Sequence, residues 1–317
     1  MLIYIVRRIL YAVPVALGVA LVVFMLVHLA PGDPISAILP PDAPQELVIK
    51  LTAYYGFDKP LPIQFFKWLS VVLTGDLGTS IATGRPVAEE VGLAFSNTLI
   101  LATSAALLSF AVAALLGTIA AYTRNPIADR AVTAIAVIGV SVPHYWLAMV
   151  LVIIFAVELG MLPPMGIGPE NAGGWRPDPA HLAHMVLPTI ALAAIPLGIV
   201  TRTIRATIRE QLNQEFVIAL RAKGLTHRQV MAHVVKNAAP TCLAVMGLQL
   251  GNLIGGSILI ETVFAWPGTG FLLNSAIFRR DLPVLQGTTL LLAMFFVSLN
   301  LVIDLFQTRI DPRIKRA

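Results

Sequence analysis

Residues 97–122 decide the class of fold, because they read NTLILATSAALLSFAVAALLGTIAAY and contain no charged side chain. As an α-helix this stretch is longer than the roughly 20 residues that cross a ~30 Å hydrocarbon layer. The whole chain agrees with it: 57 % of the 317 residues are apolar, 12 % are charged, and the mean hydropathy is +0.82. Soluble domains are about 25 % charged. The composition excludes an ordinary cytosolic enzyme and predicts an all-α polytopic membrane protein.

Six apolar stretches are long enough to be transmembrane helices. We place them at Ile9–Ala30, Asn97–Tyr122, Ala131–Val157, Met185–Thr203, Thr241–Val263 and Gln286–Gln307. The first is too long for a signal-peptide core and has no clear cleavage site, so we expect a retained helix. Pro143, Pro188 and Pro196 lie within or at the ends of spans, where proline kinks a helix. Such kinks suit a moving transporter and a static bundle equally.

The distribution of lysine and arginine predicts that both termini are cytoplasmic. With the N-terminus inside, the cytoplasmic segments carry 15 Lys and Arg residues and the short outer loops carry 3. The long segment 31–96 is left out of that comparison, because the rule concerns short loops. Positive charge therefore favours an even number of spans with the tail inside.

The predicted organisation has four parts: 1–30 with the first helix, an extracytoplasmic segment 31–96, a core 97–307 with five helices, and a cytoplasmic tail 308–317. Within the second part, Phe65-Phe66-Lys67-Trp68-Leu69 mixes aromatic bulk with one cation. It predicts either a short buried helix or a helix that lies in the membrane interface.

The cytoplasmic loop Ile204–Pro240 is rich in cations and predicts two short helices with a break at Gly224. Gln214–Lys223 has good helix formers, and Gly224 suits a left-handed cap. Thr226 and Gln229 fit a capping box that starts a second helix, which we expect to end at Pro240. The loop is either a contact site for another protein or a solvated basic segment near anionic lipid.

In the fifth span Gly247, Gly251 and Gly255 lie on one helix face, which permits close approach of another helix. Simple packing is the more economical explanation of that spacing. Gln249 and Asn252 need hydrogen-bond partners in an apolar medium, so we expect them to face a protein interior or a wet path.

The sequence lacks the residues of a catalytic centre. It has no G-x-x-x-x-G-K-[ST] motif for cradling ATP phosphates, and no nucleophile and base at convincing spacing. His181 and His184 alone are a weak metal signal, and the lone cysteine Cys242 favours a small buried thiol. We therefore expect a transport subunit with no metal and no cofactor of its own.

The order of short motifs along almost the whole chain resembles the inner-membrane permease subunits of bacterial ABC importers, in the dipeptide/oligopeptide/nickel group. It resembles the first, B-type, of two paralogous permeases. The matching motifs are Arg7-Arg8, His28-Leu29-Ala30-Pro31-Gly32-Asp33-Pro34, Gly75-Asp76-Leu77-Gly78-Thr79-Ser80, Asn97-Thr98-Leu99, Ser141-Val142-Pro143, Arg221-Ala222-Lys223-Gly224-Leu225, Gly247-Leu248-Gln249-Leu250-Gly251, Glu261-Thr262-Val263-Phe264, Trp266-Pro267-Gly268 and Asp311-Pro312-Arg313. The resemblance implies a type I ABC importer permease fold with six helices.

In that family a cytoplasmic loop docks on the ATPase through a motif that begins Glu-Ala-Ala, continues with three further residues and then has a glycine. Here the matching positions are Ile218-Ala219-Leu220 and Gly224, so the glutamate and one alanine are missing. The resemblance assigns coupling to Ala219, Leu220, Arg221, Ala222, Lys223, Gly224 and Leu225. Polarity and position nominate, as pathway or gate residues, Gly247, Gln249, Gly251, Asn252, Gly255, Glu261 and Trp266, with 261–270 at the outer rim.

The partners implied by the resemblance are a second paralogous permease, two ATPase subunits that hold ATP and magnesium, and an extracytoplasmic binding protein, all at the bacterial inner membrane among lipid. No nucleic acid is expected. Di- or oligopeptides are the expected substrates, because they are the commonest class; nickel chelates, glutathione and opine-like solutes are alternatives. An ion-coupled transporter or channel is the other class of function. It predicts a mid-membrane acidic relay, and no carboxylate lies well inside a predicted span apart from Asp304, which is peripheral.

Overall fold

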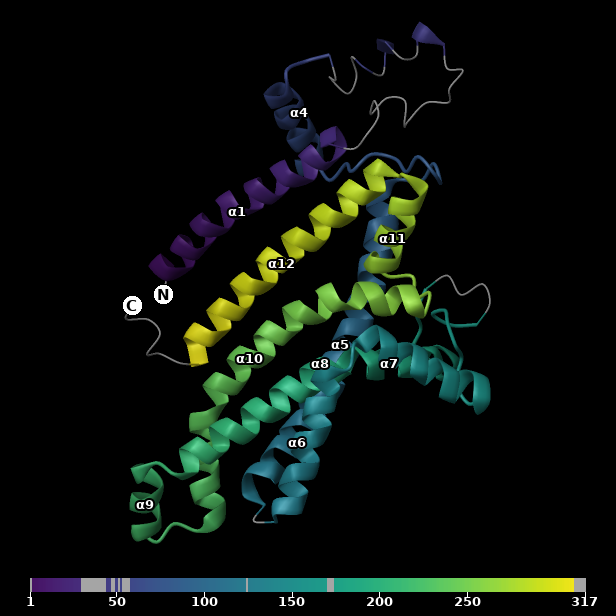
Figure 1. The fold of residues 1–317 in the computed structure, drawn as a ribbon. Coiled ribbons are helices and arrows are strands. Elements are labelled where there is room, and N and C mark those ends of the chain that lie inside the picture. Colours follow the sequence, from purple (N-terminus) through teal and green to yellow (C-terminus); the bar gives the residue numbers. More distant parts are fainter. Residues whose placement is uncertain are drawn as a thin grey trace. The chain divides into compact units, whose positions relative to one another are not determined.

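The computed structural model describes residues 2–29, 44–46, 49–50, 52, 58–123, 125–169 and 174–310. In that part of the chain all regular structure is helical, apart from one isolated bridge between Thr79 and Pro86. The elements labelled in Figure 1 are, in chain order, α1 (Leu2–Leu29), α4 (Leu61–Leu73), α5 (Val87–Tyr122), α6 (Pro126–Ser141), α7 (His144–Leu151) with a π-helical continuation η1 (Val152–Glu158), α8 (Pro179–Leu212), α9 (Glu215–Ala222), α10 (His227–Val263), α11 (Thr269–Arg279) and α12 (Leu282–Ile310).

Within the described residues, four helices are long and apolar enough to cross a membrane: α5, α8, α10 and α12. The pair formed by α6 and α7–η1 makes a fifth span if it is counted as one. Helix α1 contains the first predicted span, and its described apolar part is Leu10–Met25. The prediction of an all-helical membrane protein is confirmed at four to five spans.

The third predicted span, Ala131–Val157, is broken at Pro143, one of the prolines at which a kink was predicted. The chain bends by 101° between α6 and α7. Val142 is extended, and Pro143 follows it with φ −58° and ψ 126°. A proline disfavours helical backbone in the residue before it and donates no hydrogen bond, so the break falls there. Pro188 and Pro196, in contrast, stay inside the continuous helix α8.

The predicted break at Pro240 is wrong. Helix α10 begins at His227 and continues through Pro240 to Val263. The second short helix of the cytoplasmic loop is therefore the first part of the fifth span. Neighbouring helices in a bundle can compensate the hydrogen bond that proline removes, and α10 lies along α8 over much of its length.

The chain divides into two compact units. Unit 1 comprises Met1–Asn97 and Pro267–Leu301, and unit 2 comprises Thr98–Trp266 and Val302–Ala317. In unit 1, Phe65, Trp68 and Leu69 of α4 pack against Val23 of α1, whereas Phe66 is 67 % exposed. The side chain of Gln64 accepts a hydrogen bond from His28 at 2.9 Å. The aromatic segment is thus a short helix that is buried on one face and apolar and exposed on the other.

A buried carboxylate holds two turns of unit 1 together. Asp281 is 3 % exposed and precedes α12. One of its oxygens accepts hydrogen bonds from the Ser80 hydroxyl at 2.5 Å and from the backbone N–H of Ala82 at 3.0 Å. The other accepts from the N–H of Val284 at 3.3 Å, which places Asp281 as a cap on α12.

In unit 2, glycines bring α5 and α6 against α8 backbone to backbone. A Cβ added at Gly117 of α5 would lie 2.8 Å from the carbonyl oxygen of Thr201, and one at Gly139 of α6 would lie 2.9 Å from that of Ala194. A Cβ at Gly198 of α8 would overlap the carbonyl oxygen of Ala136. Small residues at such crossings are typical of membrane helix pairs.

Candidate functional site

The element predicted for coupling forms the expected turn at Gly224. Helix α9 ends at Ala222, and Gly224 has φ +80°. The N–H of Gly224 donates to the Arg221 carbonyl at 2.9 Å, and the N–H of Leu225 donates to the Leu220 carbonyl at 3.2 Å. These two bonds form a Schellman motif, whose left-handed residue is usually glycine because a Cβ is disfavoured there.

The restart of the helix after this turn follows the sequence prediction in part. Helix α10 begins at His227, with Thr226 as its N-cap. The side-chain oxygen of Gln229 accepts hydrogen bonds from the Thr226 backbone N–H at 2.9 Å and from the Thr226 hydroxyl at 3.0 Å. This is the glutamine half of a capping box, and it fixes the direction in which the chain leaves the turn.

Helix α9 has an inward and an outward face. Val217 is fully buried, and Phe216, Leu220 and Leu225 pack with it against α5, α8 and α10. The other predicted coupling residues are exposed: Ala219, Arg221, Ala222, Lys223 and Gly224. Leu220 and Leu225 therefore hold the element in place, and the exposed residues form its accessible surface.

Ile218 was missed as a site residue. Its side chain is 68 % exposed on α9, next to the exposed cations Arg221 and Lys223. The signal in the sequence was its place in the motif that begins the coupling segment.

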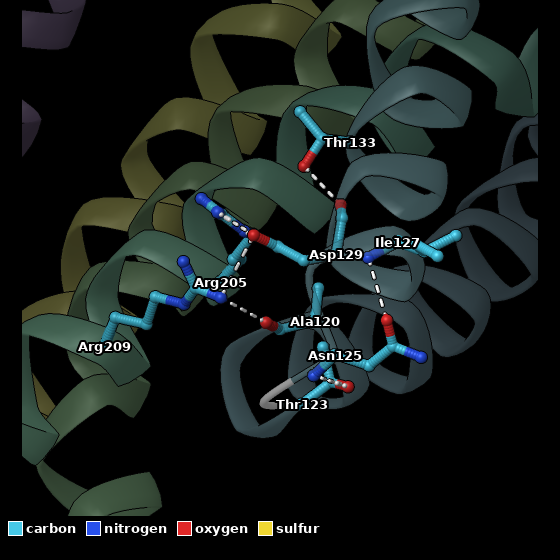
Figure 2. A network of polar contacts seen from close by, with 8 residues as sticks. All are labelled: Ala120, Thr123, Asn125, Ile127, Asp129, Thr133, Arg205 and Arg209. Atoms are coloured by element: carbon cyan, nitrogen blue, oxygen red, sulfur yellow. Dashed lines mark hydrogen bonds and ion pairs between the residues drawn. The ribbon is translucent and has the colours of Figure 1, made fainter.

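A charged network connects α6 to α8 beside this element (Figure 2). The Arg205 guanidinium donates two hydrogen bonds to Asp129, from Nε at 2.6 Å and from Nη2 at 2.7 Å. Arg209 lies one turn further along α8, 3.2 Å from the same carboxylate. It also donates to the Ala120 carbonyl at the end of α5 at 2.9 Å. Paired, bidentate contacts of this kind are the strong ones among ion pairs.

This network was also missed from sequence, where Arg205 and Arg209 were counted only as cytoplasmic cations. Their spacing of four residues on a helix was the available signal, because it places both on one face.

The Tyr122 ring, at the end of α5, contacts the His227 ring at a centroid distance of 6.0 Å. The ends of α5, α6, α8 and α10 are thus joined around the base of α9.

The predicted pathway residues on α10 have different surroundings. A Cβ at Gly247 would lie 2.7 Å from Ile303 of α12, whereas nothing lies within 4 Å of one at Gly255. Gly251 is buried and Asn252 is exposed. Gln249 is 3 % exposed, and within the described residues its side-chain oxygen accepts no hydrogen bond.

Glu261 and Trp266 are both fully buried at the end of α10. The Thr98 hydroxyl donates to the Glu261 carboxylate at 2.8 Å, and the Trp266 N–H donates to the Glu261 carbonyl at 2.9 Å. The loop before α8 reaches the same turn, because Gly166 donates its N–H to the Phe264 carbonyl at 2.8 Å. Segment 261–266 is therefore a closed, well-packed turn.

The two histidines considered for a metal each have another partner. His181 Nδ1 lies 2.7 Å from Asp178, and His184 Nδ1 lies 2.8 Å from the Met165 carbonyl. Among the residues that the structure describes, no group of three or more His, Cys, Asp or Glu side chains is placed to hold a metal ion.

Asp178 caps α8 and gives a prediction of pH dependence. The His181 backbone N–H donates to its carboxylate at 2.9 Å, and this bond, together with the His181 ring, holds the pKa of Asp178 below its usual value. A lowered carboxyl pKa contributes stability that is present above the unfolded pKa of about 3.9 and is lost as the pH falls through the folded value. We expect wild type to melt at a higher temperature than Asp178→Asn at pH 6, and the difference to shrink as the pH falls below the unfolded pKa of about 3.9. A difference that does not shrink on acidification would contradict this assignment.

Comparison with known proteins now gives the family. Residues 113–316 match the family described as binding-protein-dependent transport system inner membrane component, and residues 1–109 match the N-terminal part of such membrane components. The glutathione transport system permease protein GsiC of Salmonella paratyphi A is 37 % identical over 316 residues, 99 % of each chain. The dipeptide transport system permease protein DppB of Alkalihalophilus pseudofirmus is 37 % identical over 332 residues, which cover 99 % of this chain and 100 % of that one. A putative peptide transport system permease protein of Brucella abortus is also 37 % identical, over 98 % of both chains.

Among solved structures, the MetNI methionine ABC transporter in an inward-facing form matches with a TM-score of 0.56 at 19 % identity, over 70 % of this chain and 96 % of that one. This likeness shows the fold of an ABC transporter permease. The resemblance inferred from the sequence motifs is confirmed. The chain belongs to the family of binding-protein-dependent transport system inner membrane components: it is a multi-pass permease subunit of the inner membrane, a transport component rather than an enzyme, and it works with an ATPase and a binding protein.

Proposed function

We propose that this chain is the B-type permease of an importer for di- or oligopeptides, and that ATP-driven motion reaches it through α9. Relatives that align over nearly the full chain are named as dipeptide, peptide and glutathione permeases. Glutathione is itself a small peptide, so all three names describe compounds of one chemical class. Nickel chelates and opine-like solutes are the alternative cargo. Identification of the ligand that co-purifies with the cognate binding protein tests the substrate class directly.

Six spans with both termini in the cytoplasm are part of the proposal. We obtain six by counting the four long apolar helices, the bent pair α6–α7 as one span, and helix α1. The excess of Lys and Arg on segments that include α9 supports a cytoplasmic position for it. A second, paralogous permease and two ATPase subunits complete the proposed assembly, with lipid around it.

The seating of α9 is the observation that carries the coupling role. Its exposed residues offer Ile218, Arg221 and Lys223 to a partner, while Val217 is fully buried among the ends of three long helices. A partner that displaces α9 through this exposed face would therefore also displace the three helices that pack around Val217. The partner shifts the permease between two states only if it binds them with different affinity, and ATP binding and hydrolysis supply that difference.

The pathway is proposed to run along α10. Gln249 supports this assignment, because a buried amide oxygen without a donor is costly in an apolar medium and favours a neighbouring polar group or water. Gly247 and Gly251 lie on the same helix, where Ile303 of α12 packs against Gly247. The exposed Asn252 and the open position at Gly255 continue the proposed path, and Glu261–Gly270 is proposed as the outer rim.

Replacing Gly224 with valine tests the coupling role. A β-branched residue at φ +80° is strained by about 1–2 kcal/mol, which shifts the α9 cap away from its docking geometry. We expect ATP-dependent peptide uptake into vesicles that contain the whole importer to fall by about tenfold, while hydrolysis by the ATPases continues.

Gly160→Val is the matched control, since Gly160 also has a positive φ, +59°, and open space around it, but lies in the loop after η1. Equal loss of uptake in both variants would count against a specific role of the α9 cap. Uptake by wild type without any nucleotide would refute the ATP-driven mechanism and favour an ion-coupled transporter.

A further inference from the structure

A cavity of about 600 Å³ lies between α6 and α8 and belongs to neither the pathway nor the coupling surface. Its lining residues are Thr133 of α6 and Ile199, Arg202, Thr203, Arg205 and Ala206 of α8. The α8 residues follow one face of that helix, and α6 packs along it. Two arginines and two threonines therefore surround a space that also has apolar walls.

The cavity lies where both helices change from polar to apolar sequence. The apolar stretch of α6 begins at Ala131, and that of α8 ends at Thr203. In the proposed orientation this is the level of the lipid headgroups on the cytoplasmic side. Ile199 lies one turn further into the apolar region than Arg202, so the cavity extends from the headgroup level toward the acyl chains.

The charges at this level do not balance. The carboxylate of Asp129 is already engaged by Nε and Nη2 of Arg205 and by Arg209. Arg202 is exposed, and within the described part of the chain its side chain has no ion pair or hydrogen bond. Glu210 is the next acid along α8, eight residues or about 12 Å away. The unpaired cation at the cavity therefore has room for an anion.

We propose that this cavity binds the phosphate of an anionic phospholipid from the cytoplasmic leaflet. Arg202 presents a planar, permanently charged donor set that suits phosphate oxygens. Arg205, whose Nη1 makes no hydrogen bond to Asp129, lines the same cavity. Ile199 gives the first acyl carbons an apolar surface. Basic cavities between helices near the cytoplasmic side are suited to anionic headgroups. The choice of leaflet rests on the orientation proposed above.

Lipid binding to the purified full-length chain tests the site without any transport assay. A negative result would therefore refute the lipid site and leave the importer proposal untouched. Fluorescent phosphatidylglycerol is titrated into the protein in detergent, and phosphatidylcholine with the same acyl chains serves as the zwitterionic probe. We expect phosphatidylglycerol to bind more tightly, and Arg202→Gln to weaken its binding by about tenfold, since charge-assisted hydrogen bonds are roughly twice as strong as neutral ones. Arg202→Lys, which keeps the charge and loses the planar donor set, should lie between the two.

Arg228→Gln is the matched control, because Arg228 is an equally exposed cation of unit 2 at the start of α10, away from the cavity. An equal loss of phosphatidylglycerol affinity in Arg202→Gln and Arg228→Gln would overturn the proposal. It would show that the lipid is attracted by the positive charge of the protein in general. Equal binding of the two lipids would overturn it as well. Displacement by millimolar soluble glycerol phosphate would identify a site for free phosphate esters instead of lipid.

Discussion

Gly198→Ala is expected to destabilise unit 2 by about 3 kcal/mol, because overpacking a tight helix crossing costs roughly 1–3 kcal/mol and occasionally more. The new methyl group would overlap the carbonyl oxygen of Ala136 and lie 2.7 Å from Cγ2 of Val140. Backbone cannot rotate out of the way as a side chain can, so α6 must move away from α8. The loss exceeds the ~1 kcal/mol that alanine gains over glycine inside a helix.

Cys242 gives a direct measurement of this loss. It is the only cysteine of the chain, is 8 % exposed, and lies in the cluster that joins α5, α8, α9 and α10. A thiol-reactive dye therefore reports the temperature at which unit 2 opens. At about 2–4 °C per kcal/mol for a unit of this size, the opening temperature of Gly198→Ala should lie roughly 6–12 °C below that of wild type.

Gly255→Ala is the matched control, with no atom within 4 Å of the new carbon, and it should not lower the opening temperature. Identical curves for the two variants would show that α6 and α8 are not in close contact.

Asp129→Ala is expected to cost about 2–3 kcal/mol, less than the roughly 3–5 kcal/mol for removing one partner of a fully buried ion pair. The side chains of Asp129 and Arg205 are 19 % and 27 % exposed, so water screens the abandoned guanidinium only in part. The loss also frees Arg209, whose remaining bond goes to the Ala120 carbonyl. The same dye assay measures the effect.

A double-mutant cycle separates the pair from its surroundings. Arg205→Ala in the Asp129→Ala background should cost clearly less than Arg205→Ala alone, since the carboxylate is already absent. Glu210→Ala removes an exposed acid from the same region of α8 and should change little. Additive losses in the cycle would contradict a direct ion pair.

Local chemistry explains which features were predictable from sequence. The end of α9 at Gly224 depends on residues within one turn of it, and the bend at Pro143 depends on the ring of that proline and the residue before it. Both positions were identified. The size of the bend was not, because 101° depends on what α7 packs against and not on the proline alone.

Contacts between distant helices were the features that sequence reasoning missed. The glycine series at 247, 251 and 255 has the clearest spacing, yet of Gly247 and Gly255 only the first is tightly packed by a neighbour. The closest backbone crossings use Gly117, Gly139 and Gly198, which share no repeat. Likewise, nothing near Asp129 in the chain indicates Arg205, 76 residues away. Which residues meet depends on the crossing geometry of whole helices.

The division of α9 into two faces has an evolutionary consequence. Substitutions at Val217 and Leu220 are constrained by the helices they touch, whereas Ile218, Ala219, Arg221 and Ala222 face outward. The outward positions can drift together with a cognate subunit without loss of foldability. Related importers within one cell could thus become separate, non-interchangeable systems. A few substitutions at the exposed positions of α9 would be enough, while the packed helices stay the same.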